Sequence, residues 1–103
     1  MTTEQVVAQA ADVPPGTARV VECAGKRLAL CNVDGTIYAV DDVCTHDGGS
    51  LDQGELIGDE IECPRHGARF NVVTGRVTRL PAMMPLRTYL VRVEDGHVAV
   101  DAG

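Results

Sequence analysis

The chain has few aromatic side chains and no long apolar run. Of its 103 residues only Tyr38, Phe70 and Tyr89 are aromatic, and tryptophan is absent. Three aromatic rings are too few for a platform on which nucleic-acid bases stack. The net charge of −6 also disfavours binding to nucleic acid or to anionic membranes. Because no stretch of about eighteen apolar residues occurs, we expect no membrane span.

An export signal is also lacking. The N-terminal segment MTTEQVVAQAADVPPG has neither a basic start nor an apolar stretch. We therefore expect a cytoplasmic protein, in which disulfides are rare and cysteines near histidines are more often metal ligands. The length is that of one domain, so residues 1–103 are predicted to form a single domain that is monomeric when free.

Turn signals recur at short intervals, among them Ala24-Gly25, Asp34-Gly35 and Asp95-Gly96. Short segments rich in Val, Ile, Leu and Thr lie between them, a pattern typical of an all-β fold, here a small antiparallel β-sandwich or barrel. No convincing helix is found, and residues 4–11 have room for one short turn. The predicted strands are 4–8, 17–23, 27–33, 36–41, 60–63, 69–72, 76–79, 88–94 and 97–101.

Charge is unevenly distributed along the chain. Residues 41–62 contain eight acids and no lysine or arginine, whereas residues 63–93 contain six arginines and no acid. One interpretation is two solvated faces that attract each other. The other is a polarised surface that orients a partner protein.

Two short clusters carry the chemistry. Cys44-Thr45-His46 is followed by Asp47-Gly48-Gly49, and Cys63-Pro64-Arg65-His66 is followed by Gly67. Each cluster offers one thiolate and one imidazole in a loop between predicted strands, so two loops facing each other would enclose two sulfur and two nitrogen ligands. A zinc ion accepts this ligand set, and so does a [2Fe–2S] cluster with histidines on one iron.

The glycines beside the two clusters have a physical role. Gly48, Gly49 and Gly67 can adopt positive φ and let the backbone approach closely. Successive N–H groups in such turns form anion-binding nests, which an anionic cluster requires. For each glycine taken singly, a role as a turn residue alone remains an alternative, but this alternative is weaker for glycines next to both ligand pairs.

Together the two clusters resemble the signature of Rieske proteins. Sixteen residues separate His46 from Cys63, Leu51 and Gly54 match the segment between the loops, and Leu80-Pro81-Ala82 is similar to the proline loop that shields the cluster. The resemblance covers roughly residues 17 to 101. It implies a Rieske-like fold with two cluster-binding loops at hairpin tips. It also implies one [2Fe–2S] cluster per chain, with Cys44 and Cys63 on the inner iron and His46 and His66 on the outer iron.

Departures from the respiratory members of this family are informative. Those members have a membrane anchor and an extra cysteine in each loop, where this chain has Gly49 and Arg65. Their two hydroxyl groups that hydrogen-bond the cluster sulfurs are replaced by Ala68 and Phe70. The resemblance is therefore to the soluble, low-potential ferredoxins of bacterial aromatic-ring dioxygenase systems.

Other candidate residues are assigned structural roles. Cys23 and Cys31 are predicted to be buried small hydrophobic residues. His97, which has no cysteine nearby, is predicted to lie on the surface. Of Met83 and Met84, which flank the proline loop, we expect one in the core and one exposed.

The main functional hypothesis is a one-electron carrier that accepts electrons from a flavin-dependent reductase and passes them to a terminal oxygenase or similar acceptor. The chain is too short for a second domain with a 2-His-1-carboxylate iron site, so we expect no catalytic activity of its own. The alternatives are a small subunit of a reductase such as nitrite reductase, a protein of iron–sulfur cluster assembly or redox sensing, and a zinc-binding interaction module.

Overall fold

Ten β-strands and one short 3-10 helix make up the described part of the chain. The computed structural model describes residues 4–42, 54–63, 67–80 and 84–102. The helix spans Ala10–Asp12. The strands are β1 (Glu4–Gln9), β2 (Ala18–Cys23), β3 (Lys26–Val33), β4 (Thr36–Asp41), β5 (Leu56–Ile57), β6 (Glu60–Glu62), β7 (Arg69–Asn71), β8 (Val77–Arg79), β9 (Thr88–Glu94) and β10 (His97–Asp101).

The strands predicted from the sequence are all present, and each end lies within one residue of its predicted place. The all-β fold class is therefore confirmed. The prediction lacks β5, because its two residues, Leu56 and Ile57, are too few to show the alternation by which a strand is recognised.

Three tight hairpins define the larger part of the fold. The two-residue turns Ala24-Gly25, Asp34-Gly35 and Asp95-Gly96 join β2 to β3, β3 to β4 and β9 to β10. Both residues of each turn have positive φ, between 51° and 95°. This is the type I′ geometry that matches the natural twist of paired strands, and asparagine, aspartate and glycine favour it.

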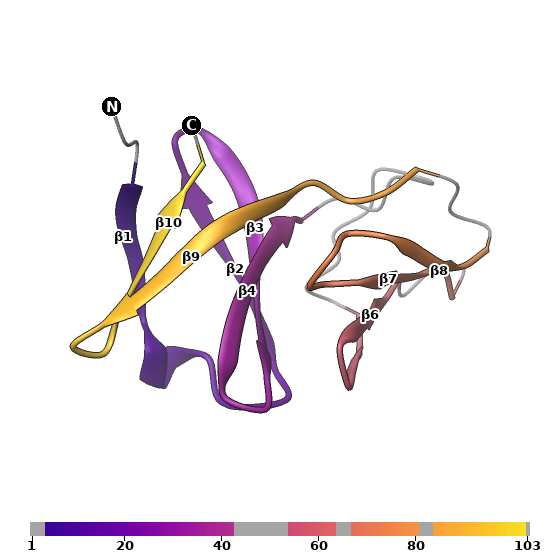
Figure 1. Ribbon diagram of the computed structural model, residues 1–103, viewed down its shortest axis with the longest axis horizontal. Helices are drawn as coiled ribbons and strands as arrows, with labels where there is room; N and C mark the ends of the chain where they lie inside the picture. Colours follow the sequence, from indigo (N-terminus) through magenta and orange to yellow (C-terminus); the bar gives the residue numbers. More distant parts are fainter. Residues whose placement is uncertain (1–3, 43–53, 64–66, 81–83, 103) are drawn as a thin grey trace.

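The strands form two antiparallel sheets, visible as two lobes in Figure 1. Six strands in the order β1-β10-β9-β4-β3-β2 curl into the larger sheet, whose edge strands β1 and β2 contact each other; we call it the barrel. Four strands in the order β5-β6-β7-β8 form the other, which we call the small sheet. The small sheet contains the hairpin that leads into the second predicted ligand cluster.

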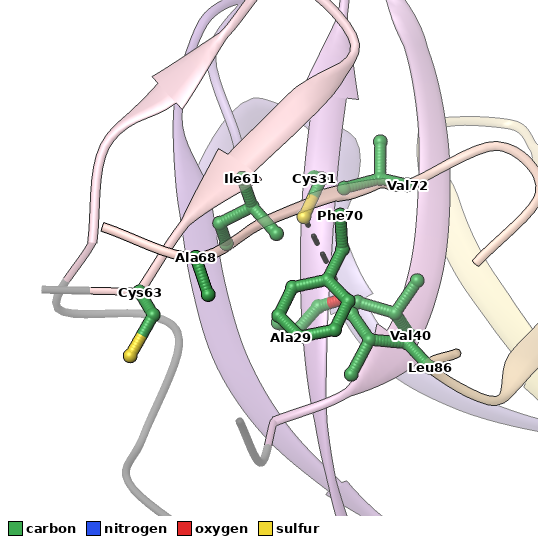
Figure 2. Packing of buried hydrophobic residues seen from close by; sticks show 9 residues of the cluster. All are labelled: Ala29, Cys31, Val40, Ile61, Cys63, Ala68, Phe70, Val72 and Leu86. Carbon is green, nitrogen blue, oxygen red and sulfur yellow. Dashed lines mark hydrogen bonds between the residues drawn. The ribbon is translucent and has the colours of Figure 1, made fainter. Parts of the chain in front are cut away.

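Strand β3 is buried on both faces and so belongs to two cores. Its residues from Leu28 to Asn32 are all buried. Since side chains alternate along a strand, Leu28 and Leu30 point into the barrel, where they pack with Val13, Val98 and Val100. On the opposite face, Ala29 and Cys31 join a second core between the barrel and the small sheet, shown in Figure 2 with Val40, Ile61, Cys63, Ala68, Phe70, Val72 and Leu86.

Gly75, in the turn between β7 and β8, makes a close backbone contact with Leu86 in the segment before β9, and this contact holds the small sheet against that segment. Gly75 accepts a hydrogen bond from Leu86 N–H at 2.8 Å and donates one to Asn71 O at 2.7 Å. Its φ is +80°, and a Cβ atom placed on it would lie 2.2 Å from Leu86 O. Only glycine fits there without a shift of the backbone.

The structural roles predicted for several side chains are confirmed. Cys23 and Cys31 are both buried, and they are not cross-strand partners, because Cys23 lies opposite Lys26 and Cys31 opposite Ala18. His97 is exposed, as predicted. Met84 is exposed too, but Met83 lies outside the described residues, so the expectation of one buried and one exposed methionine stays a prediction. Within the described ranges, no helix has the length and apolar character needed to cross a bilayer.

Candidate metal centre

The β6–β7 hairpin carries the second predicted ligand pair. Glu62 in β6 lies directly opposite Arg69 in β7. Beyond that pair, Cys63 N–H donates to Ala68 O at 2.6 Å, and Gly67 N–H donates to Cys63 O at 3.1 Å. These bonds fix the backbone on both sides of residues 64–66, the segment that contains His66.

The Cys63 thiol is buried but has no hydrogen-bond partner among the described residues. Cys63 is only 1% exposed, because it belongs to the core between the two sheets. In Figure 2 its sulfur points away from the ring of Phe70. A buried polar atom without a partner calls for an explanation, and a thiolate ligand to a metal centre is one. The position thus fits the iron–sulfur cluster that the sequence motif implies.

Gly67 has the predicted left-handed backbone conformation, but its N–H group donates to a backbone carbonyl and not to an anion. Its φ is +73°, which confirms the prediction of a left-handed residue beside the ligand loop. Its N–H donates to Cys63 O, so this amide closes the hairpin. The predicted anion-binding nest is therefore wrong for the Gly67 N–H, because the carbonyl of Cys63 lies within its reach.

The environment of Cys63 within the core is apolar. Ala68 and Phe70, the two residues that the family resemblance places where other members have hydroxyl groups, are both fully buried. Ile61, Val72 and Leu86 complete the same cluster. Neither Ala68 nor Phe70 has a side-chain donor for a sulfur atom, so the described part of the site supplies no side-chain hydroxyl to a cluster.

The chain is anchored firmly just before the first predicted ligand segment. Asp41 N–H donates to Arg87 O at 3.0 Å, and Tyr89 Oη donates to Asp41 Oδ1. Partial burial first, and Asp41 second, raise the pKa of Tyr89 to about 12. Asp42, whose side chain is fully buried, pairs with Arg27 Nη2 at 3.3 Å and donates its N–H to Arg27 O at 3.1 Å. Asp42 is thus held through backbone and side chain, two residues before Cys44.

Sequence reasoning grouped Asp42 with the surface acids, and its burial is a finding of the structure. The pairing with Arg27 depends on the register of β3 against β4, which places Leu28 opposite Asp41. Arg69 likewise pairs with Glu60 and Glu62. At the two Arg69 pairs the acidic and basic segments attract each other, which supports the first interpretation of the uneven charge, whereas Arg27 lies outside the basic segment.

The structure brings one of the four predicted ligands, Cys63, into the described part of the site. Leu80 and Met84, which flank the predicted proline loop, are 73% and 65% exposed. The other predicted residues lie outside the described residues: Cys44, His46, Gly48, Gly49, Leu51, His66, Pro81, Ala82 and Met83.

Comparison with known proteins identifies the family. Residues 3–90 match the model of the Rieske [2Fe–2S] domain. The ferredoxin component of the naphthalene 1,2-dioxygenase system of Pseudomonas putida is 41% identical over 102 residues, which cover 98% of each chain.

Two solved structures have the same fold throughout. One chain in a complex of reduced oxygenase and oxidised ferredoxin of carbazole 1,9a-dioxygenase superposes with a TM-score of 0.91 and 42% identity, covering 98% of this chain and 94% of that one. The ferredoxin of carbazole 1,9a-dioxygenase from Nocardioides aromaticivorans IC177 superposes with a TM-score of 0.92 and 32% identity, covering 97% and 98%. With this family match over most of its length and its all-β fold, the chain belongs to the Rieske [2Fe–2S] domain family.

Proposed function

We propose that this protein is the ferredoxin of a ring-hydroxylating dioxygenase system, a one-electron carrier between a flavin-dependent reductase and a terminal oxygenase. The observation that carries the proposal is the similarity to a naphthalene dioxygenase ferredoxin component over 98% of both chains. The relative works as a component of an enzyme system, which agrees with the expectation that this chain has no catalytic site of its own. The same similarity favours this role over a reductase subunit or a zinc module.

The ligand roles follow from the family motif and are part of the proposal. Cys44 and Cys63 hold the inner iron, and His46 and His66 hold the outer iron. Once bound, the cluster supplies a one-electron couple. The burial of Cys63 supports its place on the inner iron. We further propose a cytoplasmic location and a single domain over residues 1–103, and the family match over residues 3–90 supports the single domain.

The chain holds the cluster ligands on a rigid hairpin and surrounds Cys63 with apolar side chains. The β6–β7 hairpin is hydrogen bonded up to Cys63 and packs on the barrel through Phe70 and Ile61. Metal ligands on such a rigid hairpin keep nearly the same positions in both oxidation states of the cluster. The exposed Leu80 and Met84 offer apolar contacts to a redox partner beside the proline loop.

Purified protein is expected to be red-brown, with about two irons and two labile sulfides per chain. Dithionite reduction should give a rhombic EPR signal. The protein should also transfer electrons from the reductase to the oxygenase of a naphthalene dioxygenase system, measured as product formed with and without it. A protein with one zinc per chain and no labile sulfide would contradict this proposal. A protein whose reduced cluster is not oxidised by such an oxygenase would show that its electron acceptor is of another kind.

The midpoint potential should rise when a hydroxyl donor is returned at Ala68. The family range for Rieske centres is about −150 to +300 mV, and we expect this protein near its low end because Ala68 and Phe70 lack hydroxyl donors. One donor contributes about 1–3 kcal/mol, equivalent to roughly 40–130 mV for one electron. Ala68→Ser should therefore raise the midpoint by tens of millivolts in protein-film voltammetry.

The matched control is Ala39→Ser. This change adds the same hydroxyl to a buried alanine of the barrel interior, and it should leave the midpoint in place. Phe70→Tyr should act in the same direction as Ala68→Ser. If both Ala68→Ser and Phe70→Tyr retain their iron and show no shift, the missing hydroxyls do not set the potential.

A further inference from the structure

Three charged residues form one row across the outer face of the small sheet. Glu62 in β6 lies opposite Arg69 in β7, and Arg69 lies opposite Arg79 in β8. Each is the terminal residue of its strand at the same end of the sheet, where Cys63, Ala68 and Leu80 follow or precede it. The row therefore marks the edge from which the second ligand loop and the proline loop emerge.

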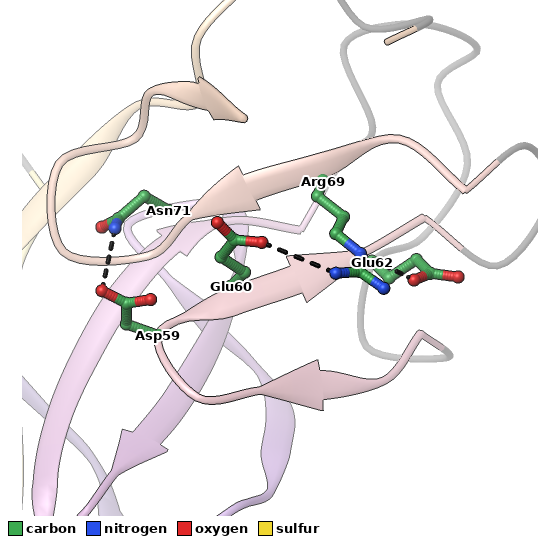
Figure 3. Close-up of polar contacts among 5 residues, drawn as sticks. All are labelled: Asp59, Glu60, Glu62, Arg69 and Asn71. Atoms are coloured by element: carbon green, nitrogen blue, oxygen red, sulfur yellow. Dashed lines mark hydrogen bonds and ion pairs between the residues drawn. The ribbon is translucent and has the colours of Figure 1, made fainter. Parts of the chain in front are cut away.

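Arg69 holds Glu62 through a close ion pair. Arg69 Nε lies 2.9 Å from Glu62 Oε2, and Arg69 Nη1 lies 3.8 Å from Glu60 Oε1 (Figure 3). The three side chains are only about 30% exposed. Charges that are partly withdrawn from solvent are screened less than free surface charges, so they act over a longer range.

The second oxygen of the Glu62 carboxylate faces the ligand loop. A Cβ atom placed on Gly67 would lie 4.0 Å from Glu62 Oε1, while Oε2 accepts the bond from Arg69. Gly67 in turn bonds to the carbonyl of Cys63. One negative charge is thus fixed between Arg69 and Gly67, which is hydrogen bonded to Cys63 and follows His66 in the sequence.

We infer that the Glu62–Arg69 pair controls the midpoint potential of the bound cluster, with Glu62 lowering it and Arg69 raising it. The inference rests on the proposed function, since it requires a cluster held by Cys63 and His66. Reduction adds one electron to the cluster. A carboxylate beside the ligand loop opposes that added charge, and the guanidinium beside the carboxylate favours it. While both are present their effects nearly cancel, and removal of either one leaves the other unbalanced.

A purely structural pair would behave differently. Glu62 and Arg69 are direct cross-strand partners, and such pairs also stabilise a hairpin. If that were their only role, neutralising either residue would lower stability but leave the midpoint of the retained cluster unchanged. A potential measurement therefore separates the two roles.

The test is protein-film voltammetry of the holoprotein at one pH and low ionic strength. Glu62→Gln should make reduction more favourable by about threefold in the equilibrium constant, or roughly 28 mV, since tenfold is 59 mV for one electron. Arg69→Gln should shift the midpoint downward by a similar factor. The double variant should lie near the wild type, and Arg69→Lys, which keeps the charge, should stay near it too.

The control is Asp59→Asn, which removes the same unit of charge from the other end of the same hairpin. Asp59 is exposed and accepts a bond from Asn71 Nδ2 at 3.0 Å (Figure 3). The Asp59→Asn variant should shift the midpoint potential clearly less than Glu62→Gln does. Equal shifts would mean that only net charge matters and would overturn the inference, as would a Glu62→Gln variant with no shift.

Cluster content is measured alongside, as iron, labile sulfide and visible circular dichroism. If Arg69→Gln loses its cluster, Glu62→Gln and Arg69→Lys still decide the question, because neither removes the positive charge. A wild-type protein without any cluster would instead refute the proposed function, which this content measurement reveals before any potential is determined.

Discussion

Cys63→Ser should yield protein that lacks its iron–sulfur cluster. The thiolate of Cys63 is the proposed anchor of the inner iron, and its position at the end of β6 is fixed by the bond from its N–H to Ala68 O. A serine oxygen is a harder ligand and stays protonated at neutral pH, so it binds iron–sulfur clusters poorly. Iron and labile sulfide should fall to a small fraction of the wild-type content, and the visible absorbance should vanish.

The same variant should be much less stable than the holoprotein. Cys63 belongs to the core between the barrel and the small sheet. A bound metal centre that the unfolded chain cannot hold contributes its binding free energy to folding. Thermal unfolding followed by circular dichroism should therefore show a melting temperature well below that of the wild type.

Cys31→Ala provides the matched control. Cys31 is fully buried in the same core, and burial first, with Asp42 second, raises the pKa of its thiol to about 12. Such a thiol stays protonated at neutral pH and is a poor ligand. Cys31→Ala should lose some packing but retain full iron. An iron-replete Cys63→Ser protein, or an iron-free Cys31→Ala protein, would contradict the assignment.

Gly75→Ala should destabilise the protein by about 2–5 kcal/mol, a large share of the roughly 5–15 kcal/mol of a typical domain. Two penalties add at this position. Its φ of +80° is unfavourable for alanine, and the new methyl group would lie 2.2 Å from Leu86 O. Because that oxygen belongs to the backbone, the clash can be relieved only by moving the segment that leads into β9.

Gly58→Ala separates the two penalties. Gly58 has a φ of +61° and nothing within 4 Å of the added carbon. The Gly58→Ala variant should therefore lose only the conformational part of the free energy of unfolding, about 1–2 kcal/mol. Both variants are compared by denaturant unfolding of the holoprotein, with iron content checked beforehand. Equal losses at the two positions would show that the contact with Leu86 is not a tight one.

Local patterns in the sequence predicted the larger lobe well. Asp34-Gly35 and Asp95-Gly96 are strong hairpin signals because type I′ turns need positive φ at both residues. Alternation between such turns then fixed the strand bounds. The burial of β3 on both faces could not be predicted, because it arises only when the small sheet packs against the barrel through Phe70 and Ile61.

The site shows the same division between local and long-range information. Spacing and residue type predicted a left-handed Gly67, which the structure confirms, and a ligand role for Cys63, which its burial supports and which stays a prediction. The pairing of Arg27 with the buried Asp42 depends on how strands align. Likewise, Glu62 and Arg69 are seven residues apart and meet only because of the β6–β7 register.

The first and last strands lie side by side, with Glu4 of β1 opposite Asp101 of β10. Both belong to the barrel, at the far end of the molecule from the β6–β7 hairpin (Figure 1). A tether attached at either end of the chain would therefore hold the protein by the lobe remote from its proposed redox site. Immobilised on an electrode in this way, the carrier would present its ligand hairpin to the solution and remain open to partner proteins, whereas direct adsorption through that hairpin would favour fast exchange with the electrode.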